Sequence, residues 1–274
     1  MKKILVPTDF SILSDNALDY AVQLAKKTGA ELLLFHVYFM PSPMYDPLVI
    51  IPSEKEFEKQ AQSSLEKLKR MISKTNPDLK VSYKTVPGVP DEEIMQYGEK
   101  EKVDFIVAGN QGAGYLEERI LGSTASLLIR KSKTPLFVID KEVKFKEPKN
   151  IVLAVDFSET DNKTVLKPLK ELAKLFKSHV QVLNVFRESQ AIPTLSEIAE
   201  SFRLTHALKF IHHSFFYREN TDVVAGINDF VTKHDIDLVV MIARDHSAIN
   251  RMFNEPHTKA MAFHSKVPLL TLHE

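Results

Sequence analysis

Apolar and polar residues follow two different periods along this chain. Short, nearly all-apolar runs rich in valine, isoleucine and leucine predict buried strands, and longer segments with apolar residues every three or four positions predict amphipathic helices. In a helix predicted over residues 11–27, the apolar positions that share one face are Ala17, Tyr20, Ala21 and Leu24. Regular alternation of such strands and helices is typical of a parallel sheet covered by helices on both faces.

The predicted elements fall into two similar series. The first series has strands over 4–7, 31–37, 80–86, 105–108 and 136–139, and helices over 11–27, 53–73, 90–101 and 125–131. The second has strands over 151–155, 180–185, 210–217, 238–242 and 267–272, and helices over 158–177, 194–207 and 222–234. Pro168 should kink the helix over 158–177 or shift its start.

Three landmarks recur in the same order, which indicates a tandem duplication. KILVPTDFS at residues 3–11 returns as NIVLAVDFS at 150–158, and VDFIVA at 103–108 returns as IDLVVM at 236–241. KTPLFVI at 133–139 returns as KVPLLTL at 266–272. We therefore expect an α/β fold of two tandem doubly wound domains, 1–140 and 150–274, joined by a polar linker.

Composition excludes several classes of function. The 274-residue chain has a formal net charge of zero, which argues against a general binder of nucleic acid or anionic membranes. It has no cysteine, so disulfides, thiol catalysis and cysteine-ligated zinc are excluded. Its ten histidines include no His-x3-His pair, so we expect no metal site. The sequence also lacks the Gly-x-Ser-x-Gly motif, which argues against a serine hydrolase.

The N-terminal apolar run is stopped by Pro7, Thr8 and Asp9 before it could serve as a signal peptide. No apolar run approaches the ~18 residues that a membrane span needs. We expect a cytoplasmic protein.

The stretch after residue 108 carries the strongest chemical signal. Gly109 and Gly112 follow a predicted buried strand, and Gly122 precedes a Ser-Thr pair that opens a helix. Glycines allow close backbone approach, and a helix N-terminus offers unpaired N–H groups, so together they predict a phosphate cradle. The crevice beyond the carboxyl end of a strand is also where open α/β sheets bind ligands. The alternative is an ordinary surface loop with turn glycines.

The second copy does not repeat the cradle. Laying the second copy on the first places Ala243 opposite Gly109, His246 opposite Gly112, Pro256 opposite Gly122 and His257-Thr258 opposite Ser123-Thr124. Added Cβ atoms block close approach, and proline removes an N–H donor. We expect this half to bind no triphosphate in the same manner; its segment 243–251 is either a site for another anion or a loop kept for packing.

The combination of Pro7-Thr8-Asp9, the glycine spacing before Ser123-Thr124 and the sequence PLFVI at 135–139 resembles the universal stress protein family, in its tandem two-domain form. The resemblance spans nearly the whole chain, by landmarks only in the second half. It implies a five-stranded parallel sheet in each domain, and some members of the family bind ATP at this loop.

Carried onto this chain, the resemblance implies an adenine-nucleotide site with Asp9 at the nucleoside, Val37 at the adenine and the glycine loop at the phosphates. The implied binding residues are Pro7, Thr8, Asp9, Val37, Ala108, Gly109, Asn110, Gly112, Gly122, Ser123 and Thr124. Any Mg²⁺ would arrive mostly with the phosphates. The alternative role of Asp9 is to cap the helix that begins near Ser11.

Three functions stay open at this point. The first is an ATP-binding stress-response or regulatory protein with one competent site and slow or no hydrolysis. The others are an enzyme of the wider adenine-nucleotide hydrolase-like group, with a substrate pocket under 38–51, and an interaction scaffold that binds no nucleotide. In that segment Met40, Met44 and Tyr45 suit either a lid or packing. The resemblance also implies edge-to-edge pairing of 136–139 with 269–272, which leaves homodimer formation open.

Overall fold

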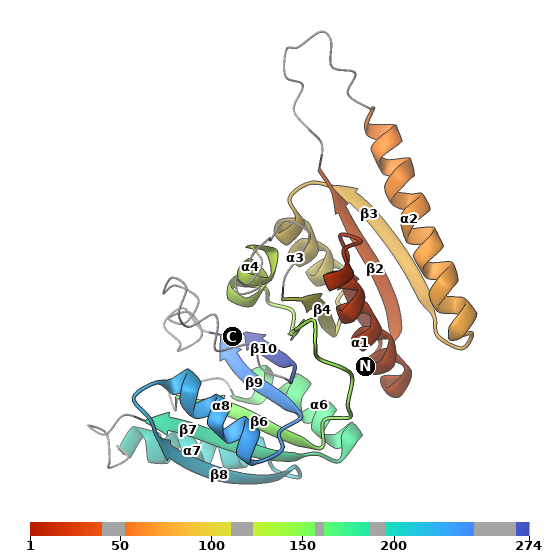
Figure 1. Ribbon diagram of the computed structural model, residues 1–274. Coiled ribbons are helices and arrows are strands. Elements are labelled where there is room, and N and C mark those ends of the chain that lie inside the picture. Colours follow the sequence, from red (N-terminus) through yellow and green to blue (C-terminus); the bar gives the residue numbers. More distant parts are fainter. Residues whose placement is uncertain (40–52, 111–122, 157–161, 187–194, 244–266, 274) are drawn as a thin grey trace, which may run out of the picture.

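The structure is a computed structural model that describes residues 1–39, 53–110, 123–156, 162–186, 195–243 and 267–273 (Figure 1). The segment with Met40, Met44 and Tyr45 lies outside these residues. In the described part of the chain, no helix is both long enough and apolar enough to cross a membrane.

The first half alternates strands and helices as predicted. Its elements are β1 (Lys3–Pro7), α1 (Ile12–Thr28), β2 (Glu31–Tyr38), α2 (Glu54–Thr75), β3 (Val81–Pro87), α3 (Pro90–Lys100), β4 (Phe105–Gly109), α4 (Ser123–Lys131) and β5 (Leu136–Ile139). Helix α4 differs from the prediction because it includes the Ser-Thr pair assigned to the end of the loop. Helix α1 shows why the boundaries are sharp: the hydroxyl of Ser11 accepts from the N–H of Ser14, and Gly29 ends the helix with a φ of 68°.

The second half repeats the plan with local differences. Its elements are β6 (Asn150–Val155), α5 (Asn162–Val165), α6 (Lys167–Phe176), β7 (His179–Phe186), α7 (Leu195–Ala207), β8 (His212–Glu219), α8 (Val223–Lys233), β9 (Leu238–Ala243) and β10 (Leu269–His273). The predicted helix over 158–177 is interrupted at Leu166, and Pro168 lies in the first turn of α6, where its missing N–H costs little. Strand β8 begins two residues later than predicted, because Phe210 has a φ of 70°, which a strand does not accommodate.

The described strands form one ten-stranded sheet in the order β3-β2-β1-β4-β5-β10-β9-β6-β7-β8. Within each half all strand pairs are parallel. The predicted fold class, two tandem doubly wound α/β halves with five strands each, is therefore confirmed. Strands β5 and β10 pair antiparallel where the halves meet, with Phe137 opposite Leu270. That pairing leaves neither of these strands as an open sheet edge.

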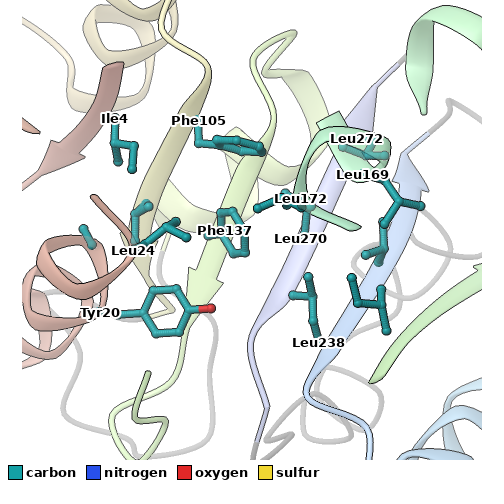
Figure 2. Close-up of a cluster of buried hydrophobic side chains, with 14 of the residues drawn as sticks. Ile4, Tyr20, Leu24, Phe105, Phe137, Leu169, Leu172, Leu238, Leu270 and Leu272 are labelled. Carbon is teal, nitrogen blue, oxygen red and sulfur yellow. The ribbon is translucent and has the colours of Figure 1, made fainter. Parts of the chain in front are cut away.

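A hydrophobic core lies on each face of the sheet. Helices α1, α2, α5, α6 and α7 cover one face, and α3, α4 and α8 cover the other. The first core continues from one half into the other across β5 and β10 (Figure 2). Phe137 lies at this junction with 1% of its surface exposed, and its ring centroid is 5.3 Å from that of Phe105 and 5.9 Å from that of Tyr20. Burial in this core raises the pKa of Tyr20.

The aspartates that recur in the landmarks VDF and IDL have a structural role. One carboxylate oxygen of Asp104 accepts from the backbone N–H groups of Lys2 and Lys3, at 2.6 and 2.9 Å. One oxygen of Asp237 likewise accepts from Lys149 and Asn150, at 2.9 and 2.8 Å. Each aspartate precedes β4 or β9 and satisfies donors at the start of the neighbouring strand, β1 or β6, so it fixes the same strand pair in both halves.

Asp237→Ala should destabilise the protein by about 2–3 kcal/mol. Asp237 is 5% exposed, so its loss leaves two backbone N–H groups without their acceptor and removes the partner of Lys146, whose Nζ lies 2.6 Å away. Chemical denaturation of this variant and of wild type gives the difference. Glu142→Ala, which removes an exposed carboxylate, is the control, and an equal loss in both variants would contradict the role assigned to Asp237.

Candidate functional site

The order of strands in the first half creates a crevice between β1 and β4. From β1 the chain moves to β2 and β3 on one side, and β4 and β5 lie on the other side. The helices that follow β1 and β4 consequently cover opposite faces of the sheet, α1 on one and α4 on the other. Such a switch point, at the carboxyl ends of the strands, is the usual ligand site of open α/β sheets.

The chain that leaves β1 is held by side-chain hydrogen bonds. The hydroxyl of Thr8 accepts from the N–H of Phe10 at 3.0 Å and lies 3.1 Å from the hydroxyl of Ser14. Asp9 accepts from the N–H and the hydroxyl of Ser11, at 3.1 and 2.6 Å, while its side chain stays exposed. The helix cap is thus Ser11, and Asp9 orients that cap.

An aromatic pair lies beside this turn. Phe10 has a φ of 60°, and its ring centroid is 4.5 Å from that of His36. The Nδ1 of His36 lies 2.7 Å from the carbonyl oxygen of Thr8, and because a carbonyl can only accept, Nδ1 is the donor. His36 therefore ties the carboxyl end of β2 to the turn that follows β1.

On the other side of the crevice, β4 ends at Gly109. Ala108 is 6% exposed and Gly109 is half-buried and in register with Ile139. Asn110 is the next residue; its N–H donates to the carbonyl oxygen of Ile139 at 3.0 Å, and its side chain donates to a carboxylate oxygen of Asp140 at 2.6 Å.

Of the other candidate residues, the structure describes Pro7, Val37, Ser123 and Thr124. Pro7 ends β1 in register with Phe35, and Val37 lies half-buried in β2. Ser123, which is exposed, and Thr124, which is half-buried, form the first turn of α4. Gly112 and Gly122 lie outside the described residues.

Strand register corrects the comparison of the two halves. Ile4 is in register with Phe105, and Ile151 is in register with Leu238, so the counterpart of Gly109 is Ile242. Ala243, which the sequence comparison placed there, corresponds to Asn110. The landmarks at 103–108 and 236–241 are 133 positions apart and agree with the strand register, so the comparison of the loops was displaced by one residue. Ile242 is 8% exposed and belongs to the core, so the second half has a large buried side chain where the first half has glycine. His246, Pro256, His257 and Thr258 lie outside the described residues.

The described residues include no group of three or more histidine or acidic side chains placed to hold a metal ion. The rings of His179 and His212 stack across β7 and β8 with centroids 4.2 Å apart. Burial and the nearby His212 and His213 lower the pKa of His179. His212 is exposed and His213 half-buried at successive positions of β8, whose side chains point to opposite faces of the sheet.

Comparison with known proteins agrees with this architecture. The model of the universal stress protein family matches residues 1–140 and again residues 147–273. Two universal stress proteins of Methanocaldococcus jannaschii are similar to parts of the chain. One is 33% identical over 150 residues, covering 52% of this chain and 84% of its own length; the other is 32% identical over 155 residues, covering 52% and 96%.

A solved structure has the same fold over the whole length. The crystal structure of a universal stress protein from Archaeoglobus fulgidus matches with a TM-score of 0.71 and 18% identity, covering 99% of this chain and 96% of that one. The family model matches both halves, and the fold carries the switch-point crevice, so this chain belongs to the universal stress protein family as a tandem pair of its domains.

Proposed function

We propose that this protein binds ATP at the β1–β4 crevice of its first half and acts as a stress-response or regulatory protein. The observation that carries the proposal is the contrast between the halves at one strand position, Gly109 against the buried Ile242. A glycine at this position in one half and a buried isoleucine in the other support one binding site per chain. The family resemblance implies an adenine nucleotide as the ligand.

The chemistry of the described residues fits a nucleotide. Asp9 is exposed at the carboxyl end of β1, where a carboxylate can accept hydrogen bonds from a ribose or a base. The first turn of α4 brings the hydroxyls of Ser123 and Thr124 and the unpaired N–H groups of a helix N-terminus, both suited to phosphate oxygens. Gly112 and Gly122 complete the proposed cradle on the basis of their spacing.

A regulatory role is favoured over an ATP-using enzyme. Phosphoryl transfer needs a positioned base or water and cations that neutralise the phosphates. At the described part of the crevice, the carboxylate of Asp9 orients the α1 cap through Ser11. We expect any hydrolysis to be slow, and Mg²⁺ to be held chiefly by the nucleotide.

We propose that residues 1–140 and 150–274 are two functional units that work as an intramolecular pair through β5 and β10. A chain of this kind needs no second copy to cover these two strand edges. Light scattering at increasing protein concentration tests whether two chains associate further.

The test of the proposed function begins with natively purified protein. Mass spectrometry of the extracted small molecules is expected to show an adenine nucleotide, and calorimetric titration of the stripped protein is expected to show one site per chain. Parallel titrations with ATP, ADP and AMP identify the preferred nucleotide. Absence of binding to all three would favour the scaffold, and release of phosphate or pyrophosphate at enzyme-like rates would favour the enzyme.

Asp9→Asn should weaken ATP binding about tenfold and leave the fold unchanged. An asparagine oxygen can still accept from Ser11, so the cap is kept, but one carboxylate acceptor becomes a donor. Loss of one hydrogen bond to a polar ligand group costs about 1–2 kcal/mol. Calorimetric titration measures the change, and Asp15→Asn in the first turn of α1 is the matched control. Equal affinities for wild type and Asp9→Asn would remove Asp9 from the site.

A further inference from the structure

The first residue of the glycine loop is attached to the linker between the halves. The side-chain amide of Asn110 donates to Oδ2 of Asp140 at 2.6 Å, and Oδ1 of the same carboxylate accepts from the N–H of Glu142 at 3.1 Å. The carbonyl oxygen of Asp140 accepts from the N–H of Val143 at 3.1 Å, which closes a turn. Asp140 thus connects the residue after β4 to the start of the linker.

A second connection runs from the linker to α1. The side-chain amide of Asn16, which is 8% exposed, donates to the carbonyl oxygens of Asp140 and Val143 at 2.7 and 2.8 Å. Its oxygen accepts from Nζ of Lys144 at 2.9 Å. A buried polar side chain with three partners is costly to disturb, so the turn has one position relative to α1. The sequence carries a faint signal of this role, since Asn16 interrupts the apolar stripe of α1 four residues before Tyr20.

The second half lacks the corresponding groups. The strand register makes Ala243 the counterpart of Asn110 and His273 the counterpart of Asp140. Alanine has no amide to donate. His273 instead points its Nε2 to the carbonyl oxygen of Ile129 in α4 of the first half, at 2.6 Å, and burial lowers its pKa. The half with the glycine at the crevice therefore has the connection, and the half with Ile242 does not.

We infer that Asp140 is a positioning residue for nucleotide binding, which couples Asn110, directly after β4, to the linker. Its charge-assisted hydrogen bond fixes the side chain of Asn110, the residue that follows β4 at the crevice. By reciprocity, a nucleotide that contacts Asn110 also stabilises the turn at 140–143. The inference rests on the proposed function. It identifies the linker as the segment that is stabilised when the first half binds a nucleotide.

The test combines a double-mutant cycle with hydrogen exchange on the full chain. Asp140→Ala and Asn110→Ala should each raise the Kd for ATP about tenfold, and the double variant should raise it no further, since both remove the same bond. In wild type, ATP should slow exchange of the Glu142 and Val143 amides, and in Asn110→Ala this effect of ATP should be lost. Glu142→Ala removes a carboxylate from the same linker but keeps its backbone donor, and it should retain wild-type affinity.

Each outcome supports or overturns the inference. Additive losses in the cycle, or an equal effect of ATP on the linker amides of wild type and Asn110→Ala, would overturn it. If Asp140→Ala does not fold, the Kd and exchange measurements on Asn110→Ala decide, because this variant removes the same hydrogen bond and keeps Asp140. If wild type binds no adenine nucleotide, the proposed function fails separately. The coupling then stands only if Asn110→Ala speeds exchange of the Glu142 and Val143 amides without nucleotide.

Discussion

Gly109→Ile is expected to weaken ATP binding about a hundredfold, equivalent to about 2.7 kcal/mol, while the protein stays folded. A β-branched side chain at the end of β4 occupies space where the protein backbone must approach the nucleotide closely. The fold should tolerate the change because the second half carries Ile242 at the same strand position, buried in the core at 8% exposure. Calorimetric titration measures the affinity, and circular dichroism with thermal melting verifies the fold.

Three further variants make this result interpretable. Gly109→Ala should cause a smaller loss, because a single methyl group leaves part of the crevice open. Ile242→Gly should create no ATP site in the second half, since the other glycines of the cradle have no counterparts there. Full affinity in a folded Gly109→Ile protein would refute the assignment of the crevice. Wild-type affinity in Gly122→Val, at the other end of the glycine spacing, would likewise refute the assignment of the loop.

Phe137→Ala is expected to destabilise the protein by about 3–5 kcal/mol, the range for removing a fully buried aromatic side chain. The ring is 1% exposed and packs against Phe105 and Tyr20 in the core that both halves share (Figure 2). The hydrogen bonds between β5 and β10 are made by the backbone and survive the change. The loss therefore reports on side-chain packing at the junction. Equilibrium unfolding in urea or guanidinium chloride gives the difference.

Phe202→Ala is the matched control because it removes the same side chain from a surface position. Phe202 lies on α7 and is 70% exposed, so its loss should change stability by less than about 0.5 kcal/mol. A similar cost at both positions would mean that the rings of Phe105, Tyr20 and Phe137 do not form the packed junction described above.

Local patterns predicted most of the elements and their order. Strands β1, β2, β4 and β7 are short apolar runs between turn residues, and α1 has both an N-cap serine and a C-terminal glycine. A few neighbouring residues therefore determine where each of these elements begins and ends. The repeated landmarks located the duplication for the same reason. The predicted boundary was wrong where residue propensity and the observed backbone conformation disagree. Phe210 has a strong strand propensity, yet its positive φ excludes it from β8.

The candidate site was predictable only in part. The glycine spacing and the Ser-Thr pair could be read directly, because each residue type carries its own backbone or hydrogen-bonding property. The role of Asp104 and Asp237 could not, since a recurring aspartate beside a strand suits a ligand site as well as a structural one. Their carboxylates bind backbone N–H groups at the ends of the strands away from the crevice, where the parallel pairing of β1 with β4 and of β6 with β9 brings them.

The amino-acid sequence was sufficient to establish the alternating α/β plan, the duplication and the glycine-bearing half, because periodicity and residue type are local properties of the chain. The repeated landmarks already pair Gly109 with Ile242, but the burial of Ile242 in the core depends on how β9 packs against its neighbours, which folding fixes. The contact of Asn16 with Asp140 joins residues 124 positions apart. Such contacts depend on strand order and helix packing across the whole sheet, so they leave no periodic trace in the sequence.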